Sequence, residues 1–283
     1  MPRVAALRLT ALLKCIGILS ILFVPMEPRT SEASLRYLQA IHDTLARIEM
    51  DKVRQAAELI AAALEEGGII HLFGSGHSSL LAQEVFYRAG GLVAINPLLD
   101  PRLGFEQGAV ESTEFEREAG HAAELLRAAG IRRDDIGIVI SNSGRNALPV
   151  EVALQMKAAG MKIVALTNVA QSRGAASRHP SGKRLFEVAD AVVDNHCPPG
   201  DAAVVIRGIA NPLGPLSTIV GAAILHLIFI EATSALARKG KPPAVFRSAN
   251  VGEGNLEHLR RAADPFRDRI RYYRPSGGNP SGA

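Results

Sequence analysis

The chain has 283 residues, of which 47% are hydrophobic and 21% charged, so it can bury a large core and is too apolar to be disordered over most of its length. Its formal net charge is only +4, and basic and acidic residues alternate along most of the sequence, which argues against a nucleic-acid-binding surface. The two cysteines, Cys15 and Cys197, lack metal-ligand spacing. We therefore expect a cytoplasmic protein without a metal, in which Cys197 is a small buried hydrophobe.

Residues 1–30 are expected to be an extension outside the folded domain. An apolar run over residues 15–24 follows Arg3, Arg8 and Lys14, as in a signal peptide. The run is too short to span a bilayer, and no A-x-A-like cleavage site follows it. We favour the interpretation that translation starts at Met26, with a domain over residues 31–260 and a C-terminal tail over residues 261–283.

Helical periodicity begins near Ser31. Apolar residues recur every three or four positions between residues 34 and 66, which predicts two helices that end at the glycines at 67 and 68. A short apolar strand is expected at 69–73, a glycine turn at 74–78, and a helix at 79–89. The order then repeats, with a strand at 92–95, a loop, and a helix that reaches about residue 129.

A continuous apolar run at 136–140 is typical of a strand buried on both faces of a parallel sheet. A polar turn follows at 141–146 and a helix at 147–159. Two further strands are expected at 162–167 and 191–194, with a loop over 173–183 between them. Strands that alternate with helices predict an α/β fold with a doubly wound, five-stranded parallel sheet and helices on both faces.

A strongly apolar helix is predicted over residues 216–237. It is hydrophobic nearly all round and must be buried, but it contains His226 and Glu231 and follows a complete α/β layer. We expect a core or dimer-interface helix and not a membrane span. The basic stretch from Arg260 to Arg274 is interpreted as a solvated tail, and the residues after 273 as disordered.

Two polar turns form the candidate binding site, because ligands of parallel sheets bind beyond the carboxyl ends of the strands, where helix N-termini converge. The first turn comprises Gly74, Ser75, Gly76, His77 and Ser78, and the second Ser141, Asn142, Ser143, Gly144, Arg145 and Asn146. Hydroxyls, amides and a guanidinium without a carboxylate favour a phosphate and also suit sugar oxygens. The alternative is that these serines and asparagines only cap helices. The first turn lacks the third glycine of a dinucleotide-binding motif.

Both turns resemble those of the SIS (sugar isomerase) domain family of phosphosugar isomerases and phosphosugar-binding regulators. Three further segments are similar to uncharacterised bacterial members: Phe86-Tyr87-Arg88-Ala89-Gly90-Gly91, His179-Pro180-Ser181-Gly182-Lys183 and Ser248-Ala249-Asn250-Val251. The similarity spans about residues 34–260. It implies a flavodoxin-like sheet, a homodimer or higher homo-oligomer, and no cofactor. It also implies that Ser78, Ser141 and Ser143 bind a sugar phosphate or aminosugar phosphate. Many members have Thr where this chain has Asn146.

Isomerases of this family use Glu and His to move a proton between adjacent sugar carbons, and the related N-acetylmuramic acid 6-phosphate etherase eliminates lactate by the same acid-base logic. The candidates here are Glu84, Glu106 and His77. Each carboxylate has a plainer explanation, because Glu84 could pair with Arg88 one helical turn later and Glu106 could be a solvated loop residue.

Two functions therefore stay open: a phosphosugar isomerase or lyase, and a non-catalytic phosphosugar sensor with the same pocket. A transcription regulator ranks last, because the N-terminal helices meet at Met50 and Asp51 without the turn and basic recognition face of a helix-turn-helix. We expect no nucleic-acid or membrane partner.

Overall fold

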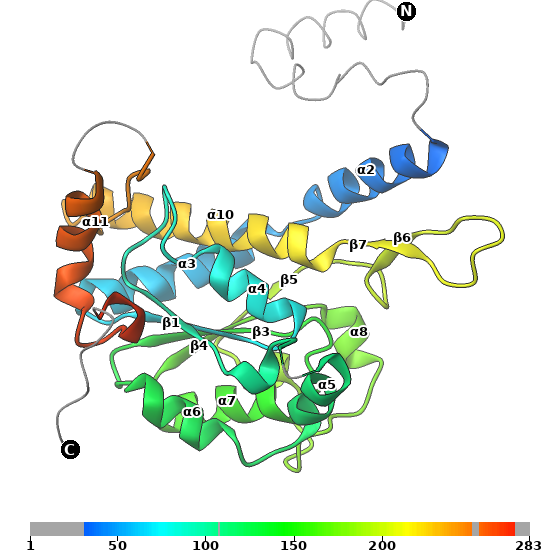
Figure 1. Cartoon of the computed structure of the whole chain (residues 1–283), viewed down its shortest axis with the longest axis horizontal. Helices are drawn as coiled ribbons and strands as arrows, with labels where there is room; N and C mark the ends of the chain where they lie inside the picture. Colours follow the sequence, from blue (N-terminus) through cyan, green and yellow to red (C-terminus); the bar gives the residue numbers. More distant parts are fainter. Residues whose placement is uncertain (1–30, 107, 251–254, 275–283) are drawn as a thin grey trace, which may run out of the picture.

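The centre of the molecule is one five-stranded parallel sheet (Figure 1), in a computed structural model that describes residues 31–106, 108–250 and 255–274. The strands lie in the order β2-β1-β3-β4-β5. Their bounds are β1 (Ile70–Gly74), β2 (Ile95–Leu98), β3 (Ile136–Ile140), β4 (Lys162–Thr167) and β5 (Ala191–Asp194). Gly74 pairs with Ile140, and Ile140 with Leu166, so β1, β3 and β4 end together at one edge of the sheet. The predicted doubly wound α/β fold is confirmed.

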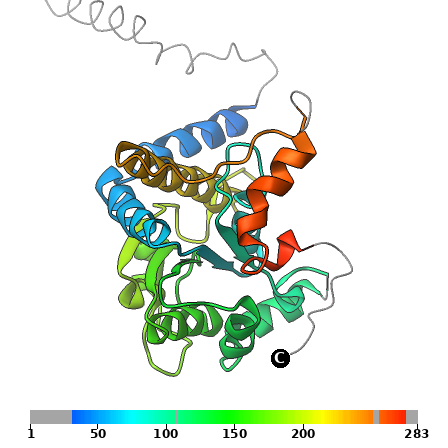
Figure 2. The same ribbon diagram turned by 90° about the vertical axis from the view of Figure 1, so that its left-hand side faces the viewer.

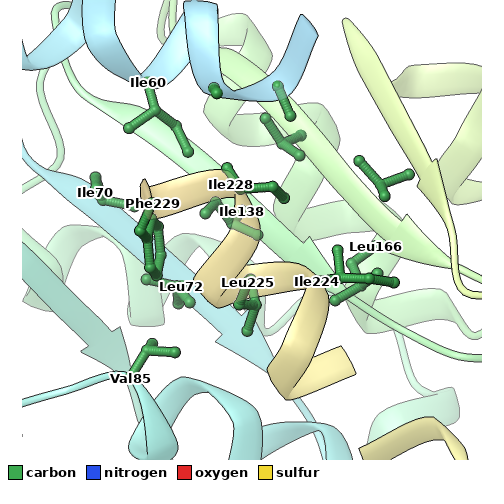
Figure 3. Close-up of a cluster of buried hydrophobic side chains, with 14 of the residues drawn as sticks. Ile60, Ile70, Leu72, Val85, Ile138, Leu166, Ile224, Leu225, Ile228 and Phe229 are labelled. Atoms are coloured by element: carbon green, nitrogen blue, oxygen red, sulfur yellow. The ribbon is translucent and has the colours of Figure 1, made fainter. Parts of the chain in front are cut away.

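Helices cover both faces of the sheet (Figure 1). One face carries α3 (Met50–Glu65), α4 (His77–Glu84) and α10 (Ser217–Arg238). The other carries α6 (Ala122–Ala129), α7 (Ala147–Ala158) and α9 (Leu185–Val188), with α5 (Ala109–Arg117) packed beside α7. Figure 3 shows the first of these cores, where Leu225 and Ile228 of α10 lie between Ile60 of α3 and the strand residues Leu72 and Ile138.

Helix α10 confirms the predicted apolar helix but is not buried all round. It packs along α3 and buries Val220, Ile224 and Leu225 among others, whereas Ile219 and Ile230 are exposed, the latter by 59%. It is the one described helix that is long and apolar enough to cross a membrane, and 44% of its most apolar stretch is buried inside the protein. Its packing against α3 and the sheet is that of a core helix with one uncovered face.

Three predicted elements differ from the structure. The helix predicted over residues 79–89 is α4, which begins at His77 and ends at Glu84. Strand β2 begins at Ile95 and not at residue 92, because Leu92 instead forms an isolated antiparallel bridge with Val245. The helix predicted to reach residue 129 is interrupted at Gly120, whose φ of +102° is outside the helical range, and it divides into α5 and α6.

The C-terminal segment folds back onto the β2 side of the sheet (Figure 2). It comprises α11 (Asn255–Ala263) and two 3₁₀ turns, Asp264–Phe266 and Arg271–Tyr273. Ile270 is fully buried and Arg269 forms an ion pair with buried Asp135, at 2.7 Å. The solvated-tail interpretation is therefore wrong for this part of the basic stretch. The proposals for residues 1–30 and for those after 274 lie outside the described residues.

Three smaller elements complete the fold. Helix α2 (Glu32–Leu45) lies against a hairpin that was not predicted, formed by β6 (Ala202–Val204) and β7 (Leu213–Pro215). The hydroxyl of Tyr37 on α2 donates to the carbonyl of Pro215, at 2.8 Å. A short helix, α8 (Val169–Arg173), follows β4, and a 3₁₀ turn (Pro101–Leu103) follows β2.

Candidate functional site

The two polar turns meet at the carboxyl edge of the sheet. Ser78 of the first turn and Asn142 of the second line the same small cavity, of about 10 Å³. The N-terminal residues of α10, Ser217 and Thr218, complete it together with Asn195, which follows β5. Sequence reasoning placed the two turns side by side, as found, but it missed these last three polar residues.

Neither helix that follows a turn is capped by a side chain. The N-cap residue of α4 is Gly76 and that of α7 is Asn146, and neither end receives a side-chain capping hydrogen bond from any described residue. The interpretation that the serines and asparagines of these turns serve as helix caps is therefore wrong. At α4 the N–H groups of Ser78 and Ser79 donate to the carbonyls of Ser75 and Gly76, whereas the first N–H groups of α7 have no acceptor among the described residues. The positive ends of both helix dipoles and the first N–H groups of α7 therefore remain available to an anion.

The serines of the two turns divide into engaged and free hydroxyls. Ser79 donates to the carbonyl of Gly76, at 2.7 Å, and Ser141 accepts from the N–H of Gly144, at 3.2 Å. The hydroxyls of Ser75, Ser78 and Ser143 have no hydrogen-bond partner within the described part of the chain, but Ser75 is buried whereas Ser78 and Ser143 are half-buried. Ser141 therefore shapes the second turn, and Ser78 and Ser143 are the hydroxyls that can bind a ligand.

Gly144 fixes the position of the second turn. Its φ is +59°, and a Cβ atom there would lie 2.7 Å from the hydroxyl oxygens of both Ser172 and Thr167. The turn thus packs directly against the end of β4 and the start of α8, where no other residue fits without displacing a neighbour. The Ser172 hydroxyl is itself buried without a described partner.

Asn142 is held in place by Asn195. The Asn195 amide donates to Oδ1 of Asn142, at 2.8 Å, and the Asn142 carbonyl accepts from the backbone N–H of Asn168. Asn195 directly follows β5, so the rule that located the two turns, polar residues at the end of a parallel strand, would also have located this residue.

Asn146 is occupied within the protein. Its amide nitrogen donates to Oε1 of Glu116, at 2.7 Å, and its oxygen accepts from Arg178. The neighbouring Arg145 has a buried Nε without a described partner. Burial, followed by the charges of Arg145 and Arg117, lowers the pKa of Arg178. The second turn therefore adjoins a cluster of guanidinium groups, which favours an anion, while Asn146 itself is not free to bind one.

The structure places Glu84 away from the turns. It forms an ion pair with Arg88, and its Oε1 lies 3.6 Å from Nε2 of His226 on α10. Glu84 lies six residues beyond Ser78 on the same helix, or about 9 Å along the axis. Burial and then the charge of Arg88 lower the pKa of His226. The simpler expectation for Glu84, an ion pair across one helical turn, is confirmed.

His77 and Glu106 are both exposed. The His77 ring packs against Phe105, with 5.1 Å between centroids. Glu106 lines a cavity of about 210 Å³ together with Gly74 and Ser79. The first turn therefore contributes to two cavities: Ser78 lines the first, and Gly74 lines the second together with Glu106.

Cys197 is buried, as expected for a small hydrophobe, and burial followed by the charge of Asp201 raises the pKa of its thiol to about 12. It is therefore unsuited to act as a nucleophile near neutral pH. No cluster of three or more His, Cys, Asp or Glu side chains that could hold a metal occurs among the described residues.

Comparison with solved structures gives distant likenesses. The phosphoheptose isomerase GmhA from Neisseria gonorrhoeae is 19% identical with a TM-score of 0.43, over 71% of this chain and 93% of its own. The NanR protein of Vibrio vulnificus, solved in complex with ManNAc-6P, is 16% identical with a TM-score of 0.43, over 83% of this chain and 67% of its own. Both likenesses are too distant to bear on the activity of this chain.

Sequence comparison gives much stronger matches. Residues 36–168 match the family model described as "SIS domain". The UPF0309 protein GK1441 of Geobacillus kaustophilus is 41% identical over 238 residues, which cover 83% of this chain and 94% of that protein. The UPF0309 protein lin2794 of Listeria innocua is 39% identical over 239 residues, 84% of this chain and 95% of that protein. The chain therefore belongs to the UPF0309 family and contains a SIS domain.

Proposed function

We propose that this protein binds a sugar phosphate across the two turns, with the phosphate at the N-termini of α4 and α7 and in reach of the Ser78 and Ser143 hydroxyls. One observation carries the proposal. Two helix N-termini without side-chain caps converge at adjacent strand ends, beside two hydroxyls that have no described partner. This arrangement offers N–H and O–H donors and two positive dipole ends to a single anion.

The charges around the second turn support a phosphate over a neutral sugar. Arg145 and Arg178 lie close enough for one to lower the pKa of the other, and an anion between them would relieve that repulsion. The Asn142 and Asn195 amides are neutral and suit the hydroxyls of the attached carbohydrate. We infer that Arg145, and not Asn146, is the ligand-binding residue at the end of this turn.

We expect the ligand to lie at the rim of the small cavity, because the cavity is too small to hold it. A volume of about 10 Å³ suffices for roughly one water molecule, so the sugar phosphate must occupy the open side of the half-buried Ser78 and Ser143. Asn142 and Thr218, which line the same cavity, then lie directly beneath the bound ligand.

A thermal-shift screen of sugar phosphates and aminosugar phosphates tests the proposal. A ligand at 100 times its Kd should stabilise the protein by about 2.7 kcal/mol, which raises Tm by roughly 5–10 °C for a chain of this size. Ser78→Ala and Ser143→Ala should each reduce this shift, whereas Ser34→Ala on exposed α2 should not. The proposal is wrong if no phosphosugar stabilises the protein, or if all three variants respond alike.

A second candidate function, proton transfer as in an isomerase or lyase, is favoured by the position of Glu106. Its carboxylate lines the 210 Å³ cavity that reaches Gly74 and Ser79 of the first turn, and it forms no ion pair with a described residue. A free carboxylate beside a phosphosugar can act as a general base toward the sugar carbons. Glu84 is less suited, because Arg88 holds its carboxylate.

Incorporation of solvent deuterium at the sugar C2, followed by NMR with a ligand found in the screen, distinguishes catalysis from sensing. Glu106→Gln should abolish the incorporation, and the matched change Glu84→Gln should leave it largely intact. Tight binding without deuterium incorporation in the wild type would instead establish a non-catalytic sensor.

We also infer a cytoplasmic homodimer that forms through the uncovered face of α10. Ile219 and Ile230 leave apolar surface exposed on a helix whose other face is part of the core, which is typical of an interface between copies.

A further inference from the structure

A second cavity lies at the β2 edge of the sheet. None of its lining residues belongs to either serine turn. It has a volume of about 170 Å³ and is bounded by β2, by α6 and by the C-terminal segment that follows α11. Four arginines line it, Arg132, Arg269, Arg271 and Arg274, together with one acidic residue, Asp268. Figure 2 shows the C-terminal segment, in red, folded against this side of the molecule.

Three of these arginines form no ion pair with any acidic side chain among the described residues. Arg269 is paired with buried Asp135, at 2.7 Å. Arg271 donates to the carbonyl of Leu99 and to the hydroxyl of Tyr272, and Arg274 donates to backbone carbonyls, so both bond only to uncharged groups. The exposed guanidinium of Arg132 makes no hydrogen bond or ion pair with a described residue.

Three uncompensated cations face one carboxylate, which leaves an excess of two positive charges around the cavity. We propose that this cavity is a second anion site, separate from the two turns, that binds a phosphate monoester of a small molecule. The dianion of a phosphate monoester matches the charge excess, and a guanidinium binds its oxygens through two parallel hydrogen bonds.

The remaining wall of the cavity indicates an organic ester and not phosphate alone. Leu98 of β2 and Leu125, Ala128 and Ala129 of α6 give it an apolar side opposite the arginines. Ligand sites of this kind combine an apolar wall with a few charged groups that fix orientation. A neighbouring cavity of about 410 Å³ shares Leu99, Leu125 and Arg271, which gives the body of the ligand room to extend.

A titration with phenyl phosphate at pH 8, followed by ³¹P NMR line shape, tests the site directly. Phenyl phosphate carries both the dianion and an apolar body, and ionic strength is held constant with chloride. The full-length chain is used in the Ser78→Ala, Ser143→Ala double variant, so that binding at the turns does not contribute. In this background Arg132→Gln and Arg274→Gln should each weaken binding by about tenfold or more.

Arg133→Gln is the matched control, because Arg133 is the exposed neighbour of Arg132 and does not line the cavity. It should change the affinity by less than about twofold, the scale of a screened surface charge. Acetate should not compete with phenyl phosphate, since a monoanion leaves one charge unmatched. The proposal is overturned if the double variant does not bind phenyl phosphate, if neither Arg132→Gln nor Arg274→Gln weakens binding, or if Arg133→Gln weakens it equally.

Discussion

Asp135 should be one of the most costly residues to neutralise in this protein. Its side chain is 1% exposed, and it accepts hydrogen bonds from the N–H of Ile69, at 3.0 Å, and from Arg269, while Nε2 of His71 lies 3.0 Å from Oδ2. Burial raises the pKa of Asp135, but these three partners outweigh burial and lower the pKa to about 2. Because the pKa lies below its ordinary value of 3.8, ionisation of Asp135 contributes on the order of 2 kcal/mol to folding at pH 7.

Asp135→Asn should therefore lower the free energy of unfolding by about 2–4 kcal/mol at pH 7, because it also leaves Arg269 without its ionic partner. Since the folded pKa is depressed, this contribution is complete above pH 3.8 and is lost as the pH falls through 2. At pH 3 roughly half of it should remain. Urea unfolding of wild type and variant between pH 7 and pH 3 measures the difference.

The matched control is Asp134→Asn, which neutralises the exposed neighbouring carboxylate and should cost less than about 0.5 kcal/mol. A cost for Asp135→Asn below about 1 kcal/mol, or one that does not shrink toward pH 3, would refute the reasoning.

Three further predictions follow from packing. Gly144→Ala should lower the stability by roughly 1–3 kcal/mol and abolish phosphosugar stabilisation in the thermal-shift assay, whereas Gly182→Ala, also at positive φ but with open space around it, should spare ligand binding. In a Cys15→Ser variant, which leaves Cys197 as the single thiol, Cys197 should react with Ellman's reagent at pH 8 only after unfolding, and rapid reaction of the native variant would contradict its burial. Ile228→Ala should lower the free energy of unfolding in urea by about 2–5 kcal/mol. Ile230→Glu should leave the fold intact and convert the proposed dimer into a monomer in sedimentation experiments. An unchanged sedimentation coefficient would show that α10 is not the interface.

The parts of the fold that were predicted correctly are those with a strong local signal. Both β3 and β4 were predicted with their observed bounds, because β3 and residues 163–166 of β4 are continuous apolar runs, as expected of strands buried on both faces. Strand β2 was predicted to begin three residues too early because residues 92–94 are as apolar as a buried strand, although they lie outside it. Leu92 bridges Val245, and Val93 and Ala94 pack against the C-terminal segment.

The interpretation of the C-terminal arginines failed for a related reason. Arg269 is ordered by Asp135, which lies 134 positions earlier in the sequence, and no local pattern reveals such a pair. In the candidate site, too, local features were predicted correctly and long-range contacts were not. The two turns could be located because strand ends are visible in the sequence, whereas the loss of Asn146 to Glu116 and Arg178 depends on where α5 and a distant loop come to lie.

The first turn also offers a way to separate ligand binding from catalysis. Ser78 and Glu106 line two different cavities beside this turn, and we infer that a sugar anchored at Ser78 would reach Glu106 by passing over Gly76. Gly76 has a φ of +50°, and a Cβ atom there would meet nothing described within 4 Å, so the passage above it is open. Gly76→Ala should narrow that passage and strain the turn by about 1–2 kcal/mol, because an L residue seldom adopts this conformation. It should reduce deuterium incorporation far more than the thermal shift with a phosphosugar. If the two decline in parallel, the ligand does not cross the turn, and Glu106 is not its base.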